Sequence, residues 1–115
     1  MANKITTLRR KSDFEILKKR GKRIYANSWL ILNYLQNSEH TNRYGWIIPN
    51  KVGGSVLRNR IKRWCREYFR NLRFHPDKHF DVNVIIRAKS DAGYFRKLKF
   101  QEFKSELDSA VKKVR

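Results

Sequence analysis

The clearest pattern of apolar and polar positions lies between residues 51 and 72, where apolar side chains recur at steps of three and four. This spacing brings side chains onto one stripe of an α-helix, so it predicts a long amphipathic helix. The stripe consists of Leu57, Ile61, Trp64, Cys65, Tyr68, Phe69 and Leu72. Ser55 is the predicted N-cap of this helix.

The opposite arc of the same helix is basic. With Glu67 as its one acid, it carries Asn59, Arg60, Lys62, Arg63, Arg66, Arg70 and Arg73. Like charges at this density cost free energy unless a polyanion relieves them. Gly53 and Gly54 precede the helix, where backbone N–H groups lack intrahelical partners and a chain without Cβ atoms can approach an anion closely. We expect this face to bind phosphates rather than serve as an ordinary solvated surface.

The N-terminal part is polar before it becomes helical. Residues 1–11 are polar and basic and are expected to form a flexible arm or a loosely packed lead-in to the first helix. Ser12 and Glu15 have the spacing of a capping box, which predicts a short helix that ends at Arg20. Gly21 is expected to stop that helix as a left-handed residue.

A strand-rich region follows. Residues 22–36 predict one bent strand or two short ones, because Ala26, Asn27 and Ser28 interrupt the apolar run. After a polar turn, residues 43–48 are expected to return as the antiparallel partner, and Pro49 closes that strand. Most aromatic side chains here should belong to the core, with at most one or two facing a ligand.

The last third alternates again between strand and helix patterns. Residues 80–88 predict a strand with one buried face, residues 89–96 a linker, and residues 98–114 a second amphipathic helix. His75 and His79 lie four positions apart, but Pro76 argues against a helix that could bring them to one metal ion. The order of elements predicts an α+β fold, a two-layer sandwich of a small mixed sheet with helices packed on it.

Composition indicates what such a fold would bind. The chain has 115 residues, with 28 Lys and Arg against 10 Asp and Glu, for a formal net charge of +18. This length predicts a single domain over residues 1–115, and this charge is typical of a nucleic-acid-binding protein. There is no run of 18 apolar residues and no signal-peptide pattern at the N-terminus, so we expect a cytoplasmic protein that does not bind membranes. The one cysteine, Cys65, is interpreted as a core residue.

No pattern in the chain predicts an active site of its own. The acids are scattered rather than spaced as metal ligands, and all three histidines fall in predicted loops. We therefore expect a non-catalytic RNA-binding chain without a metal or other cofactor.

The basic helix also resembles a known signature. Its residues are similar to the pattern of the bacterial ribonuclease P protein family, in which Lys, an aliphatic residue and Gly precede Arg-Asn, Lys-Arg and Arg-Glu-x-Phe-Arg. The matching positions are Lys51, Val52, Gly53, Ser55, Val56, Arg58, Asn59, Lys62, Arg63, Arg66, Glu67, Phe69 and Arg70. The chain departs from the pattern upstream, where Pro49 and Asn50 stand in place of an expected serine and lysine.

The resemblance implies a fold and a set of contacts. The family's crossover between the parallel strands around the central helix is left-handed, against the general preference for right-handed connections. RNA contacts are expected at Lys51, Gly53, Arg58, Asn59, Arg60, Lys62, Arg63, Arg66 and Arg70. Arg58 has a second interpretation, as a brace for the Gly53-Gly54 turn.

A second contact region is expected around the first helix. Phe14, Arg9, Arg10 and Lys18 would form a basic groove with an aromatic floor for the 5′ leader of precursor tRNA. Phe14 also has a purely structural interpretation as a core anchor. A second phenylalanine of the family's cleft corresponds here to Lys18.

The function that the resemblance implies is that of the ribonuclease P protein subunit. It would bind the catalytic RNA subunit and precursor tRNA and promote endonucleolytic 5′ maturation, while magnesium acts with the RNA. No obligate protein partner is expected. A small ribosomal or RNA-chaperone protein is the alternative, which charge and size allow and the signature does not favour.

Overall fold

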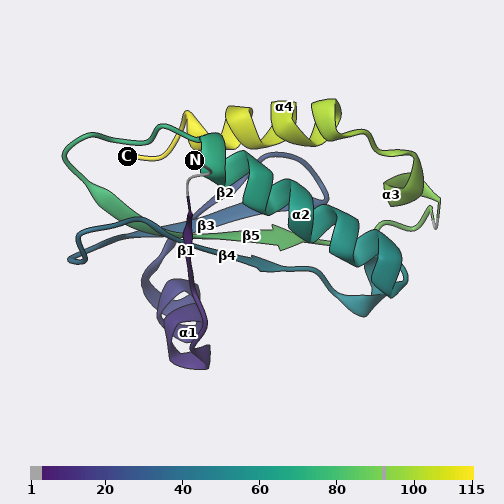
Figure 1. Cartoon of the computed structure of the whole chain (residues 1–115). Helices are drawn as coiled ribbons and strands as arrows, with labels where there is room; N and C mark the ends of the chain where they lie inside the picture. The colour runs from purple at the N-terminus through teal and green to yellow at the C-terminus, as the bar shows by residue number, and fades with distance from the viewer. Residues whose placement is uncertain (1–3, 92) are drawn as a thin grey trace.

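The computed structural model describes residues 4–91 and 93–115, which form a five-stranded mixed sheet with helices packed on it. In Figure 1, α2 and α4 lie along one face of the sheet and α1 lies against the other. The elements are β1 (Thr6–Thr7), α1 (Lys11–Arg20), β2 (Lys22–Tyr25), β3 (Leu30–Asn37), β4 (Arg43–Ile47), a 3-10 turn η1 (Asn50–Val52), α2 (Ser55–Asn71), β5 (His79–Ile86), α3 (Tyr94–Lys97) and α4 (Phe100–Val111). The predicted α+β class is confirmed, and α1 adds a partial layer on the far face.

The strand order is β1-β4-β5-β3-β2, so β5 lies at the centre of the sheet. It pairs antiparallel with β3 and parallel with β4. The prediction that the strands on either side of the basic helix run parallel is confirmed. The prediction that residues 43–48 form the antiparallel partner of residues 22–36 is wrong, because β5 separates β3 from β4.

The central place of β5 follows from burial of both its faces. Val82, Val84 and Ile86 belong to the main apolar core, while Asp81 and Asn83 on the opposite face are only 7% and 2% exposed. The prediction of one buried face was therefore incomplete. A strand with two buried faces must have neighbours on both edges and a covering layer on each side.

The main core lies between the sheet and the pair α2 and α4. The ring of Tyr44 in β4 stacks on Phe69 in α2 with centroids 4.2 Å apart. Other fully buried side chains of this core include Ile61, Cys65, Phe80, Phe103 and Leu107. Burial raises the pKa of the Cys65 thiol, so the interpretation of Cys65 as an unreactive core residue is confirmed.

The local signals predicted for α1 are wrong in detail. The helix starts at Lys11 with Arg10 as N-cap, and no side chain caps it, so the Ser12 and Glu15 capping box is absent. Gly21 is extended, with φ −72°, rather than left-handed. It is glycine because a Cβ there would lie 2.4 Å from the Leu17 carbonyl oxygen and 2.5 Å from Asn33 Oδ1. The close approach of α1 to β3, rather than a turn, therefore requires the missing side chain.

The expected N-terminal arm is largely part of the fold. Thr6 and Thr7 pair in parallel with the start of β4. Leu8 is 6% exposed, and its backbone N–H donates to the Tyr44 carbonyl at 2.8 Å. Residues 1–3 lie outside the described part of the chain. The strand thus fixes where the chain enters α1.

The C-terminal region contains two helices instead of the linker and single helix predicted. α3 occupies part of the predicted linker, and the chain is extended at Leu98 before α4 begins. The Lys99 N–H donates to Glu102 Oε1 at 3.2 Å, which satisfies one free donor at the start of α4. Phe95 and Leu98 are buried, so this corner is anchored in the core. Within residues 4–91 and 93–115, no helix has the length and apolar character needed to span a membrane.

Candidate nucleic-acid interface

The basic face of α2 is exposed along its middle turns. Asn59, Arg63 and Arg66 are exposed, Lys62 is half-buried, and all four border a shallow hollow with Val56. Among the described residues, the ion pairs that involve α2 are confined to Arg70 and Glu67, 3.1 Å apart. The cations at positions 62, 63 and 66 thus have no acid partner in that part of the chain. Such a surface attracts a polyanion.

Arg60 differs from its neighbours on the basic arc. Its Nη2 atom donates to the carbonyl oxygens of Phe95 at 2.9 Å and Arg96 at 3.3 Å. Its guanidinium lies 5.1 Å from the centroid of the Trp64 ring. The Arg60 side chain therefore links α2 to α3, and its expected contact with RNA stays a prediction.

Arg58 also has a structural contact. Its Nε atom donates to the Gly53 carbonyl oxygen at 3.1 Å, which confirms the interpretation of Arg58 as a brace for the turn before α2. Arg66 lies over the ring of Trp46 in β4, 5.3 Å from its centroid. This contact joins the basic face to the strand that precedes the helix.

The start of α2 lacks a side-chain cap. Gly54 is the N-cap and Ser55 the first helical residue, so the predicted cap at Ser55 is wrong by one position. A Cβ at Gly53 would lie 2.5 Å from Leu57 Cδ2, whereas a Cβ at Gly54 would meet nothing within 4 Å. A side chain at position 53 would displace the end of the Leu57 side chain, whereas position 54 is open. Lys51 is exposed in η1, just before this turn.

A second surface lies on the other face of the sheet, between α1 and the strands. Phe14 and Lys18 from the predicted leader-binding set border a cavity of about 440 Å³ there. The remaining lining residues are Lys11, Glu15, Arg23, Asn33, Ile47, Asn83 and Ile85. We call this cavity the α1 cleft. Three cations, one acid and one aromatic ring around two amides make a site suited to a polar, unpaired nucleotide.

Phe14 combines both interpretations made from the sequence. The residue is half-buried, and a Cβ at Gly45 would lie 2.8 Å from its Cε1 atom, so the ring packs directly on the backbone of β4. The same side chain borders the α1 cleft. Phe14 is therefore anchored by the sheet and is still available to a ligand.

The predicted leader-binding set is divided by the fold. Phe14 and Lys18 border the α1 cleft, whereas Arg9 and Arg10 do not and lie exposed at the entry to α1. The Arg9 Nε atom donates to Thr7 Oγ1 at 3.4 Å. These two arginines extend the charge beside the cleft rather than line it.

Several lining residues were not predicted as site residues. A polar residue in the middle of an apolar strand was the available signal for Asn33 and Asn83, since each interrupts a run of aliphatic residues. One row of paired positions crosses the sheet from β2 through β3 and β5 to β4, and it contains Arg23, Asn33, Asn83 and Gly45. This row depends on β5 lying between β3 and β4, whereas the sequence analysis paired the strands of β3 and β4 directly.

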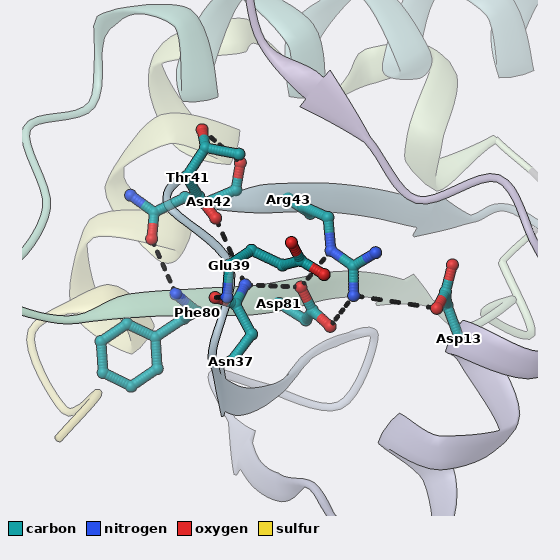
Figure 2. A network of polar contacts seen from close by, with 8 residues as sticks. All are labelled: Asp13, Asn37, Glu39, Thr41, Asn42, Arg43, Phe80 and Asp81. Atoms are coloured by element: carbon teal, nitrogen blue, oxygen red, sulfur yellow. Dashed lines mark hydrogen bonds and ion pairs between the residues drawn. The ribbon is translucent and has the colours of Figure 1, made fainter.

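A polar network beside the cleft holds α1 to the sheet. Figure 2 shows Arg43 between Asp81 and Asp13, with two bonds to Asp81 at 2.8 and 2.7 Å and a contact of 3.7 Å to Asp13 of α1. Asn37 Nδ2 donates to Asp81 Oδ1 at 2.8 Å. The hydrogen bond to Asp81 raises the pKa of Arg43, partial burial lowers it, and the nearby carboxylates raise it further, so the net direction is upward. This network was not predicted from the sequence.

His75 packs against the C-terminal part of the chain and a neighbouring ring. His75 Nε2 lies 3.2 Å from the Val114 carbonyl oxygen, and its ring stacks on Phe74. Within residues 4–91 and 93–115, no three His, Cys, Asp or Glu residues are grouped as a metal site would require.

Known proteins of one family match this chain over nearly its whole length. The family model described as Ribonuclease P matches residues 2–115. The chain is 34% identical over 99 residues to the ribonuclease P protein component of Caldanaerobacter subterraneus subsp. tengcongensis, covering 86% of this chain and 84% of the relative. It is 31% identical over 107 residues to the same component of Thermotoga maritima, covering 93% and 90%.

Solved structures show the same fold. The RNase P protein from Thermotoga maritima, in complex with 1-(4-fluorophenyl)-2-thiourea, superposes with a TM-score of 0.82 at 32% identity, covering 94% of this chain and 99% of that one. The RNase P protein of Staphylococcus aureus gives 0.75 at 26% identity, covering 95% and 94%. These overlaps cover nearly the whole of each chain, so the five-stranded mixed sheet with helices packed on it is the fold of the RNase P protein structures.

Proposed function

The chain belongs to the ribonuclease P protein family, and from that premise we propose that it binds two RNAs through the two surfaces described above. The basic face of α2 binds the catalytic RNA subunit, and the α1 cleft binds the 5′ leader of precursor tRNA. The observation that carries this division is the position of the two surfaces on opposite faces of one sheet. Both RNAs can then be bound at once and held in a fixed relation.

The proposed role of α2 rests on charge and shape. Lys62, Arg63 and Arg66 have no acid partner in the described part of the chain, and the helix that carries them is firmly packed through Ile61 and Cys65. A rigid helix with unpaired cations suits the phosphates of a folded RNA, because the phosphates supply most of the affinity without base readout. Asn59, Arg70 and Lys51 extend this surface, and Gly53 and Arg58 shape the turn at its end.

The proposed role of the α1 cleft rests on its mixture of groups. A surface for duplex phosphates needs only cations, but here the Phe14 ring and two strand amides lie among Lys11, Lys18 and Arg23. Single-stranded RNA is recognised by stacking on aromatic side chains, with cations along its backbone. The leader is the unpaired part of precursor tRNA, so the cleft distinguishes precursor from mature tRNA.

The protein's contribution to the reaction is binding and positioning. We place the magnesium ions with the RNA subunit, as the resemblance implies, where they would activate the water that cleaves the leader. The chain holds the leader beside the catalytic RNA and offsets phosphate repulsion between the two RNAs. Both effects increase the fraction of substrate bound in a reactive position.

Reconstitution with the catalytic RNA alone tests this function. At low magnesium concentration, addition of the protein should increase cleavage of precursor tRNA and should increase affinity for precursor more than for mature tRNA. The protein would compensate for the missing divalent cations through its own positive charge. Equal affinity for precursor and mature tRNA would contradict the leader-binding role. No effect of the protein on cleavage would contradict the proposed function as a whole.

A further inference from the structure

Arg66 is an exposed cation of the basic face whose partner is an aromatic ring. Its guanidinium lies over the ring of Trp46 in β4, 5.3 Å from the ring centroid, and its side chain borders the shallow hollow on α2. The ion pairs within the described part of the chain do not include it. Resting on the α2 role proposed above, we infer that Trp46 is a positioning residue, which holds the Arg66 guanidinium in place for a phosphate of the catalytic RNA.

The Trp46 ring is itself held by the sheet. It packs against the main core, and its residue is the register partner of Val84 in β5. Alternation along the strand puts it on the same face of β4 as Tyr44, which stacks on Phe69 of α2. The side chain is half-buried, so part of the ring is still open to Arg66. The ring therefore gives Arg66 a fixed point on a different element.

A ring differs from an acid as the partner of an arginine. On the same helix, Arg70 Nη1 lies 3.1 Å from Glu67 Oε2, so its charge is compensated and donors are shared with a carboxylate. An aromatic face attracts the guanidinium electrostatically and leaves its charge uncompensated. The N–H donors in the plane of the guanidinium then remain for a phosphate, which accepts two of them at once. Arg66 is thus oriented without being neutralised.

The other arginines of the face lack this combination. Arg60 lies over the Trp64 ring, but its Nη2 atom already donates to two carbonyl oxygens in α3. Arg63 is exposed, and among the described residues no ring lies under it. A side chain of that kind must be ordered when it binds, which lowers affinity by roughly two- to tenfold. Trp46 spares Arg66 that cost, so it increases the affinity for the catalytic RNA through Arg66.

A double-mutant cycle on the affinity for the catalytic RNA tests this role. One cycle contains the natural chain, Trp46→Leu, Arg66→Ala and the double variant. The matched cycle replaces Arg66→Ala by Arg63→Ala, which removes a neighbouring cation without a ring contact. A change that Trp46→Leu causes only through packing or stability affects both cycles alike, so the difference between the cycles isolates the contact with Arg66.

Trp46→Leu is expected to weaken binding by roughly two- to tenfold in the natural chain and in Arg63→Ala, and by less than about 1.5-fold in Arg66→Ala. Equal losses in the two arginine variants overturn the inference and leave the α2 role intact. An unchanged affinity of Arg66→Ala also overturns it. If Arg63→Ala is without effect as well, the α2 role itself is contradicted.

Rescue by a second ring separates the aromatic face from simple bulk. Trp46→Tyr keeps a π face for the guanidinium, whereas Trp46→Leu keeps only an apolar side chain. The tyrosine variant should therefore bind the catalytic RNA more tightly than the leucine variant. Equal affinities of the two variants would contradict the role of the ring.

Nuclear magnetic resonance tests the contact in the free protein. Protons held over an aromatic face resonate upfield, because the circulating ring electrons oppose the applied field there. The Arg66 side-chain protons should show this shift in the natural chain and lose it in Trp46→Leu, while those of Arg63 stay the same. Arg66 signals without an upfield shift in the natural chain would show that the ring does not hold the guanidinium, and the inference would be wrong.

Discussion

Arg43 and Asp81 form a two-pronged ion pair between adjacent strands, with Nε to Oδ1 at 2.8 Å and Nη2 to Oδ2 at 2.7 Å. The two residues are register partners in the parallel pair of β4 and β5. Arg43 also reaches Asp13 of α1 at 3.7 Å. The pair therefore links the central strand, its parallel neighbour and the helix that forms the α1 cleft.

Asp81→Ala should destabilise the protein and disturb the α1 cleft together. The Asp81 side chain is 10% exposed and the Arg43 side chain 25%, so the arginine would lose charged hydrogen bonds in a place that water reaches poorly. We expect a loss of about 2 to 3 kcal/mol in the free energy of unfolding. Urea unfolding measures it, with the exposed loop residue Asp77→Ala as control. Equal stability of the two variants would show that the ion pair contributes no more than a surface charge.

Whether a feature could be predicted from the sequence depends on how far apart in the chain the interacting residues lie. The amphipathic helix was predictable because its period is local, and its inward stripe from Ile61 to Phe69 is confirmed. The position of β5 between β3 and β4 was not predictable in this way. β5 comes later in the chain than both of its neighbours, and its central place involves the burial of Asp81 and Asn83. The amide row of the cleft followed from that order and was missed for the same reason.

The predicted site residues show the same difference between local and long-range interactions. Helical spacing assigned Lys62, Arg63 and Arg66 to one outward face, as the structure has them. It could not separate Arg60, whose carbonyl partners are in α3, because spacing within a helix says nothing about a neighbouring element. Arg60 and Arg63 therefore look alike in the sequence and differ in their contacts.

Arg60→Ala and Arg63→Ala should have different effects. Loss of Arg60 removes hydrogen bonds to α3 and the contact with Trp64, so we expect a loss of about 1 to 2 kcal/mol in stability. Loss of the exposed Arg63 should leave stability nearly unchanged and lower the salt slope of binding to the catalytic RNA by about 0.7 to 0.9. Thermal melts and salt titrations check the pair of variants. A reversed pattern would contradict the assignment of these two arginines.

Gly45→Ala should affect the α1 cleft and leave α2 intact. The added Cβ would lie 2.8 Å from Phe14 Cε1 and 3.2 Å from Leu8 Cδ1, so the Phe14 ring must move. Because base stacking is worth about 1 to 3 kcal/mol, we expect precursor binding to fall by up to roughly a hundredfold, with little change for mature tRNA. Phe14→Ala should give a similar loss. Gly54→Ala, where a Cβ meets nothing within 4 Å, is the control. Equal losses for precursor and mature tRNA would assign Phe14 to the core alone.

The burial of the Tyr44 hydroxyl leads to a prediction for the stability of the protein at alkaline pH. Burial raises the pKa of Tyr44 to about 12, against about 10 for an unfolded tyrosine. Between these two values the unfolded chain loses the phenolic proton and the native protein retains it. The unfolded state is thereby favoured, and stability falls as the pH rises from about 10 to about 12. At lower pH the group contributes no pH dependence.

Tyr44→Phe isolates this effect, because phenylalanine keeps the stacking on Phe69 and cannot ionise. Between pH 10 and 12 the natural protein should lose about 2 to 3 kcal/mol more than the variant. Urea unfolding at several pH values gives the free energy of unfolding of each protein. The difference between the two proteins removes the contribution of lysine titration, which is common to both. Tyr25→Phe, at a side chain that is 59% exposed, is the matched control and should follow the natural protein. Parallel curves for Tyr44→Phe and the natural chain would mean that the Tyr44 hydroxyl ionises as readily in the folded protein as in the unfolded one.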